Sequence, residues 1–172
     1  MGTSMGPARS FATTTLLSVF LLGCVSELPT SSRPGGLIPA AAKKMVLVRV
    51  VDGDTLVVSE EVRVRLHGID TPEWNQPYGA DATAALNRLV SNDIYVTVHD
   101  TDRYGRLVGE IWNTDGVNVN LRLVCDGYAW WYQKYAPDEL EYSECQESAR
   151  AQQLGLWSDD SATAPWEWRR RK

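Results

Sequence analysis

Two short acidic motifs interrupt segments that otherwise alternate like β-strands. Residues 50–58, VVDGDTLVV, carry Asp52 and Asp54 around a glycine, and Asp70 follows in the motif GIDTPE. If the strands that precede these motifs are neighbours in one sheet, Asp54 and Asp70 meet at the same end of it. Two carboxylates that lie so close repel each other unless a cation sits between them.

Such a pair of carboxylates favours a hard divalent cation. Oxygen ligands suit Ca²⁺ or Mg²⁺, whereas two histidines, His67 and His99, and scattered cysteines do not form a structural zinc motif. We expect Asp52 to act as an outer ligand of the cation. The alternative is that Asp52-Gly53-Asp54 is simply a hairpin turn, and the fragment alone does not decide between the two.

Alternating apolar and polar residues predict the strands that position these groups. In residues 61–67, Val62, Val64 and Leu66 share one face, so Arg65 and His67 fall on the other. The same pattern predicts five strands in all, at 45–51, 55–58, 61–67, 93–99 and 106–113.

Three segments have helical periodicity or helix end signals, at 79–92, 116–128 and 137–155. The first is expected to begin at Gly79 with Asp81 near its cap. Five strands in two groups, with one helix between them and two after, predict an α+β domain whose sheet closes into a small barrel.

Five sequence blocks occur in a fixed order between Val46 and Trp157: VVDGDT, RVRLHGIDTPE, YGADA, DTDRYGRLVG and LGLWS. Together they resemble the staphylococcal nuclease (thermonuclease-like) family. The resemblance implies an OB-fold-like Greek-key β-barrel of five strands with three α-helices. It also implies a Ca²⁺-dependent nuclease that hydrolyses phosphodiester bonds of DNA and RNA with little sequence preference and leaves 3′-phosphates.

The resemblance gives individual residues their expected roles in this site. Asp54 and Asp70 match the family's calcium-binding carboxylates, and Thr71 matches the position that adds a backbone carbonyl. Arg65 and Arg106 match the two catalytic arginines, whose planar forks suit phosphate oxygens.

The resemblance also matches Glu73 to the proposed general base. Its place three residues after Asp70 would let it accept a proton from a water molecule or only orient that water, and the sequence leaves both roles open.

Residues 126–137, DGYAWWYQKYAP, concentrate five aromatic side chains. Tyr104 and Tyr135 resemble the family's nucleotide-pocket tyrosines, while the register of a further pocket tyrosine stays open around Tyr132 and Gln133. Stacking of bases on aromatic rings tolerates any base, which suits a nuclease with little sequence preference.

Two cysteines fall on predicted helix faces that should meet. Cys125 and Cys145 can form a disulfide that closes about 20 residues and stabilises the fold. This pair departs from the family's usual pattern, and two buried free thiols are the alternative.

The N-terminal region predicts export. Arg9, an apolar stretch at 11–22 and small residues before Cys24 are typical of a signal peptide, here 1–23. The motif LLGC resembles the bacterial lipobox, so we expect a lipid on Cys24 that anchors the protein to the cell envelope without spanning the membrane. An ordinary signal peptide and full secretion are the alternative.

The remaining boundaries follow from composition. Residues 24–44 read as a flexible tether, 45–160 as the nuclease domain, and 161–172 as a basic, Trp-containing tail. For that tail, disorder is favoured over contact with phosphate or anionic lipid.

The net charge of −5 does not favour binding to a polyanion, so affinity for DNA or RNA must come from a local cluster of basic side chains. Two rival functions follow: a non-catalytic nucleic-acid-binding OB-fold module, and a calcium-stabilised domain for another ligand. We expect a monomer.

Overall fold

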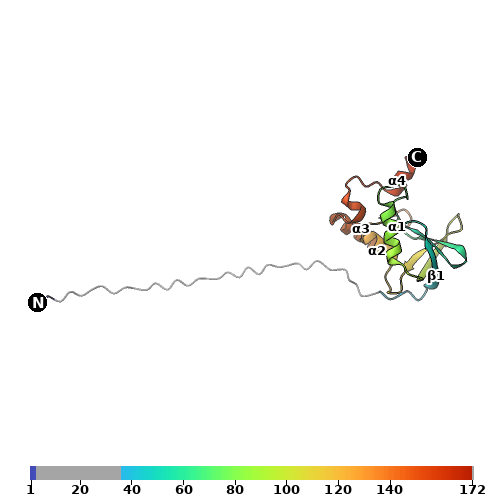
Figure 1. Cartoon of the computed structure of the whole chain (residues 1–172), viewed down its shortest axis with the longest axis horizontal. Coiled ribbons are helices and arrows are strands. Elements are labelled where there is room, and N and C mark those ends of the chain that lie inside the picture. Colours follow the sequence, from blue (N-terminus) through green and yellow to red (C-terminus); the bar gives the residue numbers. More distant parts are fainter. Residues whose placement is uncertain (3–35, 172) are drawn as a thin grey trace. The chain divides into compact units, whose positions relative to one another are not determined.

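Five strands form a closed β-barrel in the computed structural model, which describes residues 1–2 and 36–171 (Figure 1). Their order around the barrel is β1-β2-β3-β6-β5. Strands β3 and β6 pair in parallel, and the other neighbours pair antiparallel. The strands are β1 Lys43–Val50, β2 Thr55–Val58, β3 Val62–Leu66, β5 Asp93–Thr101 and β6 Leu107–Trp112.

The barrel closes around side chains that the alternation of its strands sends inward. Val64 and Leu66 of β3 are fully or almost fully buried, and Ile94, Val96 and Ile111 from β5 and β6 join them in the core. Because successive side chains of a strand point to opposite faces, Arg65 lies on the face opposite Val64 and Leu66. Burial of Val64 and Leu66 in the core therefore decides on which face of β3 Arg65 lies.

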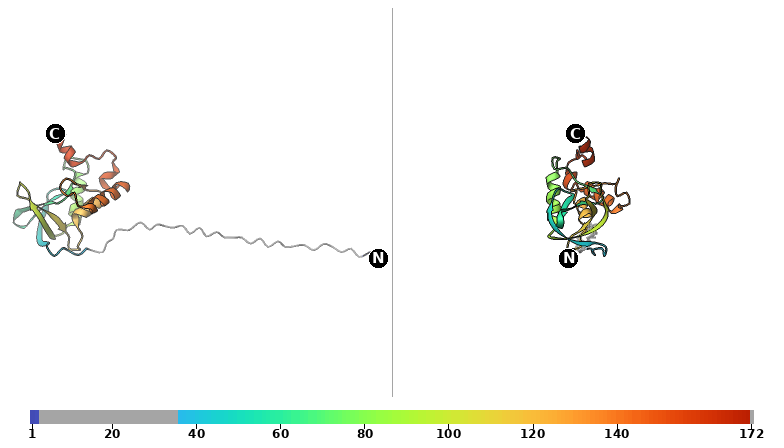
Figure 2. Two further views of the ribbon diagram at one scale, coloured as in Figure 1. Left: turned by 180° about the vertical axis from the view of Figure 1, so that it is seen from behind. Right: turned by 90° about the vertical axis from the view of Figure 1, so that its right-hand side faces the viewer.

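Helices cover one side of the barrel (Figures 1 and 2). Helix α2 packs against both α1 and α3 and also contacts β6. The α-helices are α1 Gly79–Leu89, α2 Val119–Cys125, α3 Leu140–Ala151 and α4 Pro165–Arg170. The remaining elements are short: the 3₁₀ turns Ser59–Glu61 and Gly155–Ser158, and a two-stranded sheet of β4 Ile69–Asp70 and β7 Trp130–Trp131.

The predicted α+β class and the five-stranded barrel are confirmed, with two differences at the C-terminal end. The described residues contain four α-helices instead of three. The prediction that the tail is disordered is wrong for Pro165–Arg170, which form α4. Pro165 lies in the first turn of this helix, where the missing backbone N–H costs no hydrogen bond. Helix α4 is ordered because Trp166 and Arg169 contact the rest of the domain, as described below.

Cys24, the predicted signal peptide apart from its first two residues, and most of the predicted tether lie outside the described residues. The last two residues of that tether, Lys43 and Lys44, already belong to β1. In the described part of the chain, the search for helices of sufficient length and apolarity to cross a membrane finds none.

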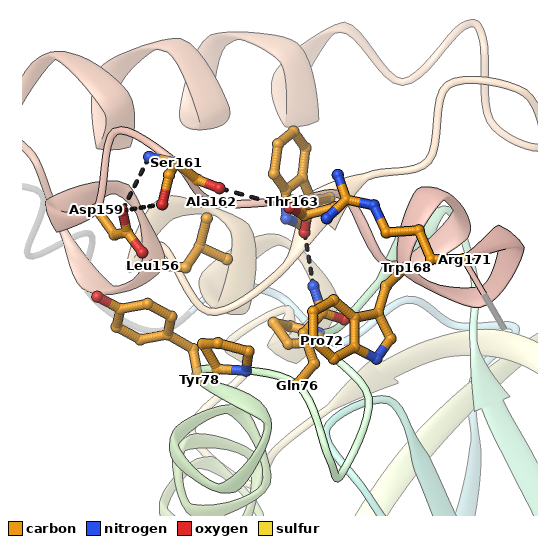
Figure 3. Close-up of a pocket in the computed structure, with 12 residues that line it drawn as sticks. Pro72, Gln76, Tyr78, Leu156, Asp159, Ser161, Ala162, Thr163, Trp168 and Arg171 are labelled. Atoms are coloured by element: carbon orange, nitrogen blue, oxygen red, sulfur yellow. Dashed lines mark hydrogen bonds between the residues drawn. The ribbon is translucent and has the colours of Figure 1, made fainter.

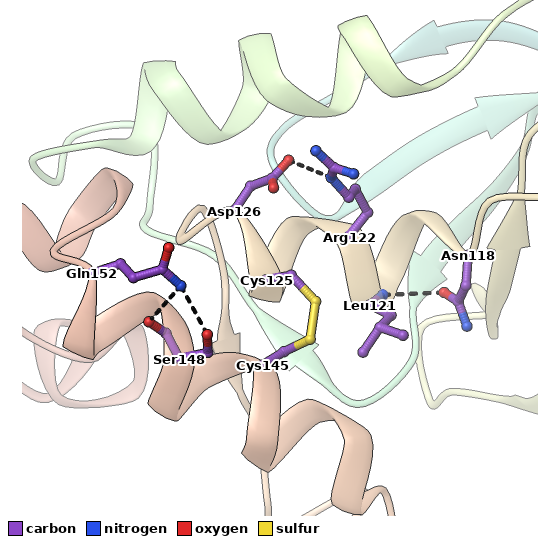
Figure 4. The surroundings of a disulfide bond; sticks show 8 residues. All are labelled: Asn118, Leu121, Arg122, Cys125, Asp126, Cys145, Ser148 and Gln152. Carbon is purple, nitrogen blue, oxygen red and sulfur yellow. Dashed lines mark hydrogen bonds and ion pairs between the residues drawn. A yellow bond between two sulfur atoms is a disulfide. The ribbon is translucent and has the colours of Figure 1, made fainter. Parts of the chain in front are cut away.

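The two predicted cysteines form a disulfide that ties α2 to α3 (Figure 4). Cys125 is the last residue of α2, Cys145 lies within α3, and their Cα atoms are 4.4 Å apart. Asn118 caps the start of α2 by accepting a hydrogen bond from the Leu121 backbone at 3.1 Å. The covalent link therefore joins the two helices that follow the barrel.

Loss of this disulfide should lower the free energy of unfolding by about 3 kcal/mol, because the link restricts a 20-residue loop of the unfolded chain. Urea denaturation of the wild type, with and without reductant, and of Cys145→Ser measures the effect. We expect reductant to shift the wild-type midpoint to that of the variant and to leave the variant unchanged. A wild-type midpoint that reductant does not move would contradict this role.

Candidate metal and phosphate site

Asp54 is a buried carboxylate whose oxygens are held by hydrogen bonds. It follows β1 in the loop that leads into β2 and is 7% exposed. The backbone N–H and the hydroxyl of Thr71 both donate to Asp54 Oδ2 at 2.9 Å, and the Thr55 hydroxyl donates to Oδ1 at 3.2 Å. Thr71 thus orients the first acidic group through its N–H and hydroxyl.

Asp70 lies beside Asp54 because one guanidinium group joins them. Arg65 Nη2 donates to Asp70 Oδ1 at 2.8 Å, and Arg65 Nη1 pairs with Asp54 Oδ2. Asp70 belongs to β4, which pairs with β7, and is 1% exposed. Burial raises the pKa of Asp70, against the opposing effect of the nearby guanidinium groups. The two carboxylates predicted to meet therefore do converge.

The donor set fits a hard cation but is incomplete by itself. Asp54 Oδ2 and Asp70 Oδ1 pair with the Arg65 guanidinium, and each carboxylate has further oxygen lone pairs. Across residues 1–2 and 36–171, however, no cluster of three or more His, Cys, Asp and Glu side chains could hold a metal ion. A cation at this pair would take its other ligands from backbone or water oxygens, as Ca²⁺ and Mg²⁺ commonly do.

Asp52 shapes the loop that presents Asp54. Its Oδ1 accepts a hydrogen bond from the Asp54 backbone N–H at 3.1 Å. Burial, and then the charge of Asp54, raise the pKa of Asp52 to about 6. Asp52 thus has the contact expected of a turn residue, and its role as an outer ligand stays a prediction.

Gly53 allows the loop to approach Thr71 closely. A Cβ atom at Gly53 would lie 2.6 Å from Thr71 Oγ1 and 2.8 Å from the Cβ of Ala82 in α1. Both distances are too short for real side-chain contacts, so only glycine fits without displacing its neighbours. A glycine between the two acidic residues is therefore required for Thr71 to reach Asp54.

Glu73 joins the site through a residue that the sequence analysis missed. Arg169 of α4 donates from Nη1 to Glu73 Oε1 at 2.7 Å and from Nη2 to Asp70 Oδ2 at 2.8 Å. Burial would lower the pKa of Arg169, but hydrogen bonds to Asp70 and Glu73 raise it above its ordinary value. In the sequence, the basic, Trp-containing composition of residues 161–172 is the one indication that the segment of Arg169 has a role.

Arg106 lines the same groove but does not reach the carboxylate pair. Its Nε donates to Asp102 Oδ2 at 2.7 Å, and its backbone N–H donates to Asp102 Oδ1 at 3.0 Å. The Arg106 guanidinium lies over the Tyr104 ring, with its Cζ atom 5.7 Å from the ring centroid. The second predicted arginine is thus held at the groove by an acidic neighbour and an aromatic ring.

The site opens into a groove with a volume of about 780 Å³. Tyr104, Tyr132 and Tyr135 all line it. Tyr104 and Tyr135 have 69% and 61% of their surface exposed, and Tyr132 stacks on Trp166 with ring centroids 4.9 Å apart. The basic side chains that line the groove are Arg65, Arg103, Arg106 and Arg169. Six acidic side chains line the same groove, namely Asp52, Asp54, Asp70, Glu73, Asp100 and Asp102. The lining is therefore mixed in charge and is not the basic cluster expected of a site that binds a polyanion.

The two histidines lie together at the groove wall. His67 and His99 stack with ring centroids 4.5 Å apart, and His99 Nε2 lies 3.8 Å from Glu110 Oε2. Burial, and then the neighbouring His99, lower the pKa of His67.

Substitution Gly53→Ala should lower the free energy of unfolding by roughly 1–3 kcal/mol, because the added methyl group must push Thr71 or Ala82 aside. Chemical denaturation measures this change, with Ala80→Ser as a control that enlarges an exposed side chain of α1 by one atom. Wild-type stability of Gly53→Ala would show that the close approach has no energetic importance.

Comparisons with known proteins agree with this architecture. The sequence profile of the family described as staphylococcal nuclease homologue matches residues 63–159. An uncharacterized endonuclease of Escherichia coli O157:H7 is 44% identical over 130 residues, which cover 73% of this chain and 84% of that protein.

Two further relatives carry nuclease names. A micrococcal nuclease of Shigella flexneri is 40% identical over 137 residues, 72% of this chain and 79% of its own length. A probable staphylococcal-like nuclease of Oryza sativa subsp. japonica is 41% identical over 117 residues, 67% of this chain and 35% of its own length. With this profile match and these identities, the chain belongs to the family of staphylococcal nuclease homologues.

Proposed function

We propose that the protein is a Ca²⁺-dependent endonuclease that hydrolyses phosphodiester bonds of DNA and RNA with little sequence preference and leaves 3′-phosphates. One observation carries the proposal: the buried carboxylates of Asp54 and Asp70 converge on Arg65 at the base of an arginine-lined groove. Family membership supports a nuclease with a nucleic-acid substrate. The calcium requirement, the products and the lack of sequence preference are parts of the proposal.

Asp54 and Asp70 would hold the cation, with the backbone carbonyl of Thr71 as a further ligand. A bound divalent cation would add positive charge at the scissile phosphate and make a coordinated water more acidic. Hydrogen bonds from Thr71 already fix the Asp54 side chain, so this carboxylate would lose little conformational entropy when it binds the cation.

Arg65 and Arg106 would stabilise charge on the phosphate oxygens as the water attacks. Each guanidinium is held before substrate arrives, Arg65 by the two aspartates and Arg106 by Asp102. Donors fixed in advance stabilise developing charge more effectively than donors that must first become ordered.

Glu73 would accept the proton of the attacking water, or orient that water, at the rim of the same groove. Its side chain is 31% exposed, so a water molecule can reach it. Tyr104 and Tyr135 present exposed rings on which bases can stack, a contact that tolerates any base.

Digestion of plasmid DNA and of RNA by the purified protein tests this proposal, with added Ca²⁺ in one arm and a chelator in the other. Cleavage that requires Ca²⁺ and leaves 3′-phosphate ends is expected. Retarded migration of DNA without cleavage would instead support a non-catalytic binding module, and neither effect would support a calcium-stabilised domain for another ligand.

Removal of the Arg106 guanidinium should raise the barrier to cleavage by about 3 kcal/mol, because a donor to the transition-state phosphate is lost. Cleavage rates of Arg106→Ala and of the control Arg63→Ala measure the effect. Arg63 is an exposed arginine of β3 outside the groove lining, so its replacement should leave the rate within a factor of about two. Near-normal turnover of Arg106→Ala would remove its catalytic assignment.

We also propose that the protein is exported and anchored to the cell envelope by a lipid on Cys24, as the LLGC motif predicts. Replacement Cys24→Ala should move the protein from the membrane fraction to the soluble fraction after cell fractionation. Wild-type protein found in the soluble fraction alone would contradict the anchor.

A further inference from the structure

The C-terminal segment is docked on the loop that carries Glu73. Gln76 connects the two: its Oε1 accepts from the Glu73 backbone N–H at 3.1 Å, and its Nε2 donates to the Thr163 carbonyl at 2.6 Å. Figure 3 shows Gln76 and Thr163 joined in this way beside Trp168. The Trp168 indole N–H donates to Asn75 Oδ1 at 3.4 Å. The Glu73 loop and the C-terminal segment are therefore held as one unit.

Aromatic packing holds α4 against Trp130 of β7 and against Tyr132, the residue that follows β7. Trp166 stacks on Tyr132 with ring centroids 4.9 Å apart and an interplanar angle of 10°, and it meets Trp130 edge to face at 5.7 Å. Since Trp130 is paired with Asp70 across the β4–β7 sheet, the same contacts place α4 next to the acidic pair. One turn of helix after Trp166 comes Arg169.

Arg169 bridges two carboxylates that would otherwise repel each other. Its Nη1 lies 2.7 Å from Glu73 Oε1 and 3.3 Å from Asp70 Oδ1, and its Nη2 lies 2.8 Å from Asp70 Oδ2. Asp70 is buried and fixed, whereas Glu73 is partly exposed on a loop and could turn to solvent. The Arg169 guanidinium between them therefore sets the place of the more exposed Glu73 carboxylate.

We propose that Arg169 is a positioning residue of the nuclease, which holds the Glu73 carboxylate beside Asp70 so that it meets the attacking water in the productive orientation. Helix α4 is then a functional wall of the site. The inference rests on the proposed function and on the role of Glu73 in it. Because α4 lies beyond residues 63–159, the family match assigns it no role.

Steady-state cleavage of a fluorophore–quencher oligonucleotide at saturating Ca²⁺ tests this role in four proteins: wild type, Arg169→Gln, Arg169→Lys and Arg170→Gln. Arg170→Gln is the matched control, because it removes the same charge from an exposed neighbour in the same helix. We expect Arg169→Gln to lower kcat by about 10- to 100-fold with little change in KM, since a misplaced catalytic group slows the chemical step. Arg169→Lys should recover part of that loss, and Arg170→Gln should behave like the wild type.

A double-mutant cycle with Glu73→Gln separates positioning from a merely structural role. If Arg169 acts through Glu73, Arg169→Gln causes no further loss of kcat in the Glu73→Gln background. Circular dichroism and melting temperature check folding, which should survive because Asp70 keeps Arg65 as a partner in the variant.

The inference is overturned by wild-type kcat in Arg169→Gln, by an equal loss in Arg170→Gln, or by losses that multiply in the double variant. A variant that cleaves faster than the wild type would also overturn it, because Arg169 would then be a competitor of the cation for Asp70. A wild-type protein that does not cleave the oligonucleotide would refute the proposed function itself, so the two failures are distinguishable.

Discussion

Two buried carboxylates share one guanidinium group, and most of the local structure of the site depends on this pairing. Asp54 and Asp70 come from separate segments and have little contact with solvent, and a buried charge is costly unless it is paired. Arg65 supplies that partner from a strand whose other face belongs to the barrel core. Packing of the core and placement of the charges are therefore parts of the same constraint.

This constraint also explains why the surrounding residues are small or hydroxylated. Gly53 lets the β1–β2 loop approach Thr71, and Thr71 uses its N–H and hydroxyl to hold Asp54. The same geometry lets an acidic chain act on a polyanion in the proposed function. The net charge is −5, yet the groove gathers four arginines around its acidic base. Because acidic side chains also line this groove, a bound cation together with the arginine donors, and not a net positive field of the lining, would meet the phosphates.

Much of this arrangement could be predicted from sequence because it depends on local periodicity. Alternation in β3 separates Val64 and Leu66 from Arg65, and it also predicts the barrel that brings Asp54 and Asp70 together. Arg169 could not be predicted, because it meets Asp70 across a separation of 99 residues and no periodic pattern links them. A six-residue helix rich in Trp and Arg also has the composition of a solvated basic tail.

The predicted cap of helix α1 is also wrong, for a similar reason. The sequence places its cap near Gly79 and Asp81, but the cap residue is Tyr78, which has a left-handed φ of 68° and makes no side-chain capping bond. Tertiary contact decides this start, because a Cβ at Gly79 would lie 2.0 Å from the Glu73 carbonyl oxygen. This close approach to the Glu73 backbone is a tertiary contact that capping preferences do not encode.

Calorimetric titration of the protein with Ca²⁺ is the most direct test of the central claim that Asp54 and Asp70 together bind one cation. The account predicts one ion per chain, with affinity weakened about tenfold or more in Asp54→Asn and unchanged in Asp81→Asn, which alters an exposed carboxylate of α1. Equal Ca²⁺ affinity in Asp54→Asn and the wild type would contradict it.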